Sequence, residues 1–232
     1  MKQKIIALVP AAGTGTRFGD ALPKQYLDIA GRPLLFHTLL ALSKVSRIDA
    51  VTVVLSPDDS HWKNFSTHWT ALGIKVTTAM VGGKSRGETI INGLNAIAQL
   101  LNMNANDWVM VHDAARPCIR PELIEQFIDE LEHDPIGGLL ALPLNDTIKS
   151  DDGNLRVTKT IPREGLWRAQ TPQMFRFRLL REALTGCPEA TDEAQAIETL
   201  GSQPKLVMGD SANLKVTYAP DLKLARMLLT GA

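Results

Sequence analysis

Short apolar runs alternate along this chain with segments that have the periodicity of amphipathic helices. Strands are predicted at residues 5–9, 51–55, 75–79, 108–111 and 138–142. Helices are predicted at residues 33–42, 85–101 and 220–229, with two more opened by Pro121 and by Thr191 or Asp192, the latter with Leu200 on its inner face. This alternation predicts an α/β, Rossmann-like fold whose mainly parallel, twisted sheet carries helices on both faces. Ligands of such sheets bind at the carboxyl ends of the strands.

Composition is typical of a single globular domain spanning residues 1–232, with 44% apolar and 22% charged residues. The net charge is zero, so we expect no general attraction to nucleic acid or to a membrane surface. Cys118 and Cys187 fit neither a C-x-x-C motif nor a disulfide framework, which favours a cytoplasmic protein. No apolar run approaches the roughly 18 residues of a membrane span.

A polar segment at residues 143–162 interrupts the alternation. It contains a turn at residues 151–154 between two β-prone runs, a pattern that predicts a hairpin. A hairpin this polar has no core to pack on and is marginally stable alone. It is either a flexible excursion or an arm that docks on a second subunit.

The loop after the first strand predicts a polyanionic ligand. It reads Pro10-Ala11-Ala12-Gly13-Thr14-Gly15-Thr16-Arg17, and Lys24 follows. Small residues let backbone N–H groups approach phosphate oxygens, and two cations stand beside them. The dinucleotide fingerprint does not fit, because the third glycine, Gly19, comes one residue late, and no Walker motif occurs in the chain.

Further motifs follow the loop in order. They are Pro23-Lys24-Gln25-Tyr26, Gly82-Gly83-x-x-Arg86, His112-Asp113-Ala114-Ala115-Arg116-Pro117, Asp146-Thr147-Ile148-Lys149, Arg163-x-Gly165-Leu166-Trp167, Thr171-Pro172-Gln173, Thr191-Asp192-Glu193-Ala194 and Asn213-x-Lys215-Val216-Thr217. With the loop, this series resembles the 2-C-methyl-D-erythritol 4-phosphate cytidylyltransferase family over nearly the whole chain. The resemblance implies transfer of CMP from CTP to methylerythritol phosphate in isoprenoid synthesis, by a Mg²⁺-dependent homodimer with exchanged arms.

The resemblance also implies roles for individual residues. Arg17 and Lys24 would be catalytic, stabilising the pentacoordinate phosphorus and the triphosphate. The nucleotide would be bound by Pro10, Ala11, Ala12, Gly13, Gly15, Gly82, Gly83, Thr89, Asp113, Ala114 and Arg116, with Asp113 as a candidate Mg²⁺ ligand. The sugar-alcohol phosphate would be bound by Thr147 and Arg163 from a partner's arm and by Thr171, Thr191 and Lys215 of the home subunit. Two positions depart from the family pattern: Thr89 replaces the more usual serine, and Lys84 replaces a small or acidic residue.

Nucleotidyl transfer needs positioning and positive charge more than covalent catalysis. The sequence fits this need, because it shows no Ser/His/Asp or Cys/His constellation, and its histidines lack metal-ligand spacing. A ribitol 5-phosphate cytidylyltransferase is the nearest alternative, although the His112 to Pro117 motif favours methylerythritol phosphate. A non-catalytic or redox nucleotide-binding protein is a further alternative, which the Arg17 and Lys24 pair and the displaced Gly19 argue against.

Overall fold

The computed structural model describes residues 3–13, 22–73 and 75–231. Its strands are β1 (Ile5–Pro10), β2 (Asp28–Ile29), β3 (Arg32–Pro33), β4 (Ala50–Val54), β5 (Val76–Ala79), β6 (Trp108–Val111), β7 (Gly137–Pro143), β8 (Ile148–Asp151), β9 (Val157–Ile161), β10 (Trp167–Arg176) and β11 (Lys205–Met208). Its α-helices are α1 (Leu34–Lys44), α2 (Ser66–Thr70), α3 (Arg86–Leu100), α4 (Pro121–Leu131), α5 (Phe177–Gly186), α6 (Glu193–Thr199) and α7 (Ala219–Thr230). Short 3₁₀ helices are η2 (Lys24–Tyr26) and η3 (Trp62–Phe65).

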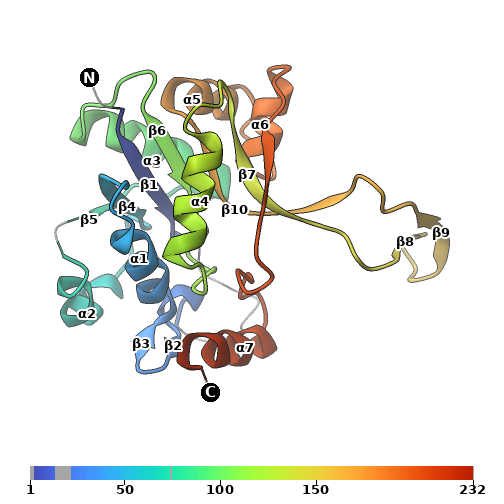
Figure 1. The fold of residues 1–232 in the computed structure, drawn as a ribbon. Helices are drawn as coiled ribbons and strands as arrows, with labels where there is room; N and C mark the ends of the chain where they lie inside the picture. Colours follow the sequence, from blue (N-terminus) through green and yellow to red (C-terminus); the bar gives the residue numbers. More distant parts are fainter. Residues whose placement is uncertain (1–2, 14–21, 74, 232) are drawn as a thin grey trace.

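A seven-stranded sheet with the order β11-β7-β10-β6-β1-β4-β5 forms the centre of the molecule (Figure 1). Strand β1 pairs in parallel with β4 and β6, β4 pairs in parallel with β5, and β11 pairs in parallel with β7. Only β10 runs antiparallel to its neighbours in this sheet, β6 and β7. The predicted mainly parallel sheet is confirmed, and each strand predicted from an apolar run is present.

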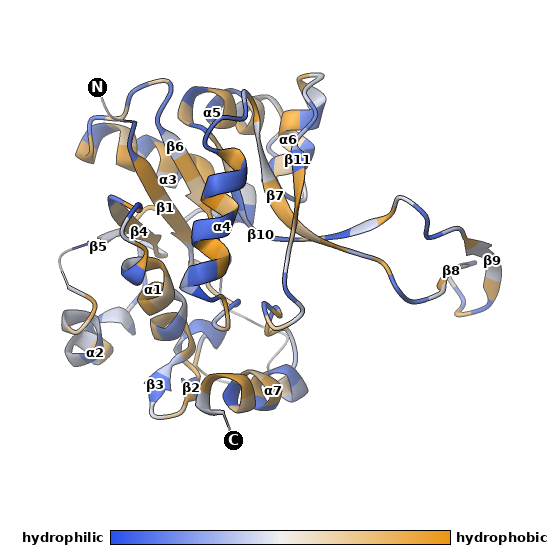
Figure 2. Ribbon diagram, in the orientation of Figure 1, coloured by the Kyte–Doolittle hydropathy of each residue, from blue (hydrophilic) through white to orange (hydrophobic). Residues whose placement is uncertain are grey.

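Helices cover both faces of the sheet. Because successive strand side chains point to opposite faces, Ala7 and Val9 of β1 pack with α1 and α4, whereas Ile6 and Leu8 pack with α3, α5 and α6. Figure 2 shows the amphipathic pattern directly on α4, which is divided into hydrophobic and hydrophilic stripes. The prediction of helices on both faces is confirmed.

The starts of the helices follow their sequence signals. Ser85 caps α3 by accepting a hydrogen bond from the backbone N–H of Glu88 at 3.1 Å, and Pro121 lies in the first turn of α4. Asp192, rather than Thr191, caps α6. The prediction that Leu200 faces inward is wrong, since α6 ends at Thr199 and Leu200 is 42% exposed.

Several of the described elements have no counterpart in the sequence prediction, among them β10, β11 and α5 of the central fold and the short elements β2, β3 and α2. Strand β10 does not read as an apolar run because its centre buries the polar residues Gln170, Thr171 and Gln173. Pro172 lies where the pairing with β7 is irregular, between Ala169 and Gln173, as expected for a proline inside a sheet.

The polar segment forms the predicted hairpin. Strands β8 and β9 make a separate two-stranded antiparallel sheet, which Figure 1 shows extended away from the seven-stranded sheet on two long connections. Two of its apolar residues are strongly exposed, Leu155 at 91% and Val157 at 65%. The docking of this arm on a second subunit stays a prediction. Among the helices of the described residues, none is long and apolar enough to cross a membrane.

Candidate functional site

A pocket of about 560 Å³ opens beyond the carboxyl ends of β1 and β6. Its described lining residues are Pro10, Ala11, Ala12, Gly13, Lys24, Gln25, Ser56, Gly83, Lys84, Ser85, Arg86, Thr89, Asp113, Ala114, Ala115 and Lys215. The loop after β1, the start of α3 and the segment after β6 therefore converge here, where a doubly wound sheet binds its ligands. Most of the sequence-predicted nucleotide residues line this one pocket.

The loop after β1 is held by backbone contacts. The Ala11 N–H donates to the Val54 carbonyl at 2.8 Å, and the buried Gln25 amide donates to the Ala11 carbonyl at 2.9 Å. Ala12 packs tightly against Gly82, where a Cβ would clash with the Ala12 methyl and lie 2.8 Å from the Leu55 carbonyl oxygen. A side chain at Gly82 would therefore push the two segments apart.

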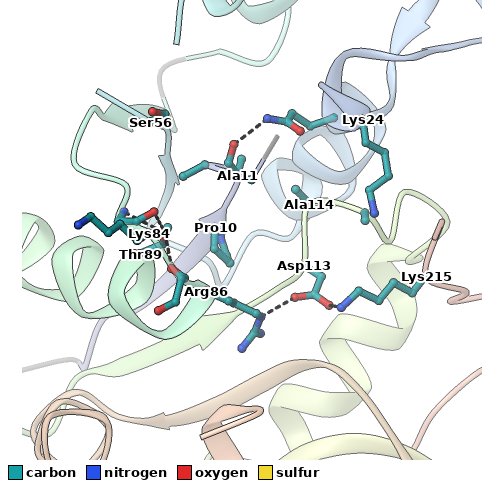
Figure 3. A pocket seen from close by; sticks show the side chains of 16 residues that line it. Pro10, Ala11, Lys24, Ser56, Lys84, Arg86, Thr89, Asp113, Ala114 and Lys215 are labelled. Atoms are coloured by element: carbon teal, nitrogen blue, oxygen red, sulfur yellow. Dashed lines mark hydrogen bonds and ion pairs between the residues drawn. The ribbon is translucent and has the colours of Figure 1, made fainter. Parts of the chain in front are cut away.

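Thr89 ties the Gly83 turn to the first turn of α3. Its hydroxyl accepts from the Gly83 N–H at 3.1 Å and donates to the Ser85 carbonyl at 2.8 Å. Gly82 lies just behind this turn and outside the pocket lining. Lys84 lines the pocket, but in Figure 3 its side chain points away from Asp113.

Asp113 is a carboxylate around which cationic side chains of the pocket gather. Its Oδ1 lies 3.1 Å from Nε of Arg86, and its Oδ2 lies 2.8 Å from Nζ of Lys215 and 3.9 Å from Nε of Arg116. Figure 3 shows Arg86 and Lys215 meeting the carboxylate from opposite sides. Burial alone would raise the pKa of Asp113, but Arg86 and Lys215 outweigh it and hold the pKa well below its usual range.

Arg86 continues the charge network to Glu193. Its Nη1 and Nη2 donate to the two carboxylate oxygens of Glu193 at 2.6 and 3.2 Å, and Glu193 is fully buried. Burial raises the pKa of Glu193, and the Arg86 charge opposes that shift. Neither residue carries a role in the sequence analysis. The sequence does contain one indication of their importance, because Arg86 lies in the motif that begins at Gly82 and Glu193 lies in the motif that begins at Thr191.

Lys24 enters the pocket from η2. Its Nζ donates to the carbonyl of Val216 at 2.7 Å, directly beside Lys215 in the chain. Tyr26 anchors the other end of η2, because its buried ring stacks on Phe65 and its hydroxyl donates to Asp59 at 2.7 Å. The predicted catalytic lysine is thus held on a supported helix.

Arg116 and Thr171 lie behind the pocket, against Asp113. Nη1 of Arg116 donates to the Asn213 carbonyl at 2.6 Å, and the Asp113 N–H donates to the Thr171 hydroxyl at 3.0 Å. His112 also contacts Thr171, with 3.1 Å between Nδ1 and the hydroxyl oxygen, and burial lowers the pKa of His112 to about 4. These residues are positioned to support Asp113 and do not line the pocket.

Other predicted site residues are not brought to the pocket of their own chain. Thr147 and Arg163 are exposed residues of the arm, where Nη1 of Arg163 donates to the Asn145 carbonyl. Thr191 is exposed at the start of α6. The predictions for Gly15 and Arg17 fall outside the residues that the structure describes.

Protein groups alone do not form a metal cage in the described part of the chain, which holds no cluster of three or more His, Cys, Asp or Glu side chains suited to a metal. Asp113 is the one carboxylate among the described residues lining the pocket. A metal here would take most of its ligands from a bound substrate.

Known proteins resemble this chain over nearly its full length. A family model described as 2-C-methyl-D-erythritol 4-phosphate cytidylyltransferase matches residues 5–231. Proteins of that name are 55% identical over 223 residues in Dechloromonas aromatica, covering 96% of each chain, and 50% identical over 229 residues in Nitrosospira multiformis, covering 98% of each. Among solved structures, 4-diphosphocytidyl-2C-methyl-D-erythritol synthase superposes with a TM-score of 0.87 at 37% identity, covering 99% of each chain. The Francisella tularensis cytidylyltransferase superposes with a TM-score of 0.80 at 30% identity, covering 97% of this chain and 100% of that one.

Proposed function

The chain belongs to the 2-C-methyl-D-erythritol 4-phosphate cytidylyltransferase family, and we propose that it transfers CMP from CTP to 2-C-methyl-D-erythritol 4-phosphate. The observation that carries this proposal is the pocket at the carboxyl ends of β1 and β6, where the small-residue loop, Lys24 and the Asp113–Lys215 pair converge. A phosphate oxygen of the alcohol substrate attacks the α-phosphorus of CTP, and the bond from that phosphorus to pyrophosphate breaks. The products are 4-diphosphocytidyl-2-C-methyl-D-erythritol and pyrophosphate.

Positive charge and positioning drive this reaction, because both reactants are anions and charge accumulates on the leaving pyrophosphate. Lys24, whose Nζ is 2.7 Å from the Val216 carbonyl, stabilises the triphosphate as its charge develops. Arg17 supplies the second catalytic cation.

The nucleotide side of the pocket is built from the small residues of the loop and of the Gly82–Gly83 turn. The base binds among Pro10, Ala11, Ala12, Gly13, Gly15, Gly82, Gly83 and Thr89, with Asp113, Ala114 and Arg116 on the opposite side. Polar groups of this wall are matched to cytosine, and a base that left them unpaired would bind poorly.

The alcohol phosphate is bound by Lys215, Thr171 and Thr191 of the home subunit. Thr147 and Arg163 come from the arm of a second subunit, so the enzyme is a homodimer with exchanged arms. Support comes from the exposure of both arm residues and from the extension of the hairpin away from the seven-stranded sheet of its own chain (Figure 1). The Arg163 fork suits a phosphate monoester, since it binds two oxygens at once.

Mg²⁺ fits this site as a substrate-borne ion. When bound, the ion would supply positive charge that offsets the charge of the triphosphate, and hard cations of this kind need only one or two protein carboxylates. Asp113, whose two oxygens together offer about four acceptor sites, would hold it while keeping its contact with Lys215. We place the enzyme in the cytoplasm, where the free thiols of Cys118 and Cys187 stay reduced.

Pyrophosphate release from CTP tests the proposal when the acceptor is varied. Methylerythritol phosphate should support release with a kcat/KM at least tenfold above that of ribitol 5-phosphate, because each good hydrogen bond lost to an acceptor hydroxyl costs about tenfold or more. Lys24→Ala serves as the inactive control. A preference for ribitol 5-phosphate, or no release with either acceptor, would overturn the assignment.

A further inference from the structure

Arg86, which lines the pocket and whose side chain is 30% exposed, forms an ion pair with the fully buried Glu193. Burying a carboxylate costs desolvation energy that good pairing geometry only offsets. The start of α6 does not depend on Glu193, because Asp192 caps it at 2.9 Å from the Gln195 N–H and Gln173 accepts from the Ala194 N–H at 2.8 Å. The contacts of the Glu193 carboxylate are instead made with Arg86.

Glu193 fixes the orientation of the Arg86 fork. The guanidinium is planar, so holding Nη1 and Nη2 on the Glu193 carboxylate also aims Nε. Nε donates to Oδ1 of Asp113 at 3.1 Å. The buried carboxylate thus determines how Asp113 is held.

Asp113 in turn holds Lys215. Its second oxygen lies 2.8 Å from the Lys215 ammonium, and the Lys215 side chain is 46% exposed. A half-exposed lysine has several rotamers open to it and loses them only when a fixed partner selects one. The chain Glu193–Arg86–Asp113 is such a partner.

We propose that Arg86 and Glu193 are a positioning pair that holds Lys215, through Asp113, in place for the phosphate of the alcohol substrate. This inference rests on the proposed function and adds two residues to it. Apart from Asp113 itself, the nucleotide side does not depend on the pair, because the Ser85 cap and the Thr89 hydroxyl hold the Gly83 turn through bonds of their own. The pair should therefore affect the two substrates unequally.

Glu193→Gln is the first test, because it removes the charge and keeps the shape. The KM for methylerythritol phosphate should rise on the order of tenfold, as a displaced binding group predicts, while the KM for CTP changes less than about twofold. Asp107→Asn is the matched control: Asp107 is also a buried carboxylate, and it accepts from the N–H groups of Lys4 and Asn104 at the opposite end of β6. The control should keep both KM values. Equal changes in the two KM values of Glu193→Gln would overturn the inference.

A double variant distinguishes a positioning role of the Arg86–Glu193 pair from a purely structural one. Arg86→Met alone strands the buried Glu193 charge and should lower Tm, whereas Arg86→Met combined with Glu193→Leu removes both charges and should recover much of that Tm. A positioning pair predicts that the double variant keeps the raised KM for methylerythritol phosphate despite its recovered Tm. A purely structural pair predicts that KM returns to the wild-type value together with Tm, which would reject the inference. Turnover by the wild-type protein in the same assay tests the proposed function separately. An inactive wild type would contradict the proposed function, whereas an active wild type leaves the KM values of the variants to decide the role of the pair.

Discussion

Lys24 and Asp113 show how single residues shape the charge of the pocket. Lys24 reaches in from a short helix anchored by Tyr26, and Asp113 gathers Arg86, Lys215 and the more distant Arg116 around one carboxylate. Cations of this kind can strengthen their contacts as negative charge develops on a leaving group. Removing such a cation should therefore lower the rate of catalysis without preventing the protein from folding.

Lys24→Ala should lower kcat on the order of 10²-fold or more while leaving a normally folded protein, because it removes a contact that strengthens in the transition state. Arg17→Ala should behave alike. Lys24→Arg should not restore full activity, since the guanidinium is larger and planar. Steady-state kinetics with thermal unfolding as the folding control measure both effects. A near-normal kcat in either alanine variant would show the catalytic assignment to be wrong.

Asp113→Asn should make stability less dependent on pH. The folded pKa of Asp113 is depressed, so its stabilisation is present above the unfolded pKa of about 3.9 and is lost as pH falls below it. We expect the free energy of unfolding of Asp113→Asn to be lower than that of wild type by on the order of 3 kcal/mol at pH 7. This difference should become smaller below about pH 4. Urea unfolding of both proteins over a range of pH measures it. The control Glu130→Gln, which breaks an exposed pair with Lys205, should cost less than about 1 kcal/mol. A gap between wild type and Asp113→Asn that stays constant with pH would contradict the network.

At the scale of elements, the site depends on two loops packed closely enough to exclude side chains. Gly82 and Ala12 come from different strand ends and meet where Gly82 also donates its N–H to the Leu55 carbonyl at 2.8 Å. The adjacent Gly83 turn is fixed to α3 by Thr89. The spacing of these loops sets the width of the nucleotide side of the pocket.

Gly82→Ala should raise the KM for CTP several-fold, because the new Cβ forces the loop after β1 away from the Gly83 turn. Gly186→Ala is the control, since Gly186 ends α5 with nothing within 4 Å of an added Cβ, and it should be neutral or slightly stabilising. Substrate titration of both variants decides the matter: an unchanged KM in Gly82→Ala would show that loop spacing does not control CTP binding.

A single sequence predicts secondary-structure elements better than it predicts contacts between distant side chains. Strands such as β1 and β6 are predictable because burial on both faces demands continuous apolar runs. Strand β10 escapes that logic, since Gln170 and Gln173 are buried through hydrogen bonds to residues such as Asp210 and Asp192. The pocket loop is visible as a local motif, whereas the Arg86–Glu193 pair joins residues 107 positions apart and follows only from the fold.

At the scale of the whole molecule, contacts within a single chain do not explain how the arm is stabilised. Its two strands pack on each other through polar contacts such as the 2.7 Å bond between Lys149 and Thr160, and a two-stranded hairpin is marginal alone. Docking on a second subunit would bury it and would bring Arg163 to another chain's pocket. A two-fold axis would make the exchange reciprocal.

Mixed dimers test this exchange. Lys24→Ala and Arg163→Ala homodimers should each be nearly inactive, and refolding them together in equal amounts should restore roughly a quarter of wild-type activity, since half the dimers are mixed and each holds one intact site of two. Pyrophosphate release after confirmed subunit exchange measures the recovery. No recovery would mean that the arm serves the pocket of its own chain.

The most direct test of the central claim follows the α-phosphorus of the nucleotide. With methylerythritol phosphate as acceptor, label on the α-phosphate of CTP should appear in the alcohol product and label on the γ-phosphate in pyrophosphate. The kcat/KM for CTP should exceed that for UTP by well over tenfold, with ATP poorer still, because the wrong base leaves buried polar groups unpaired. Comparable turnover of ATP and CTP, or α-label that never enters the alcohol product, would contradict the account.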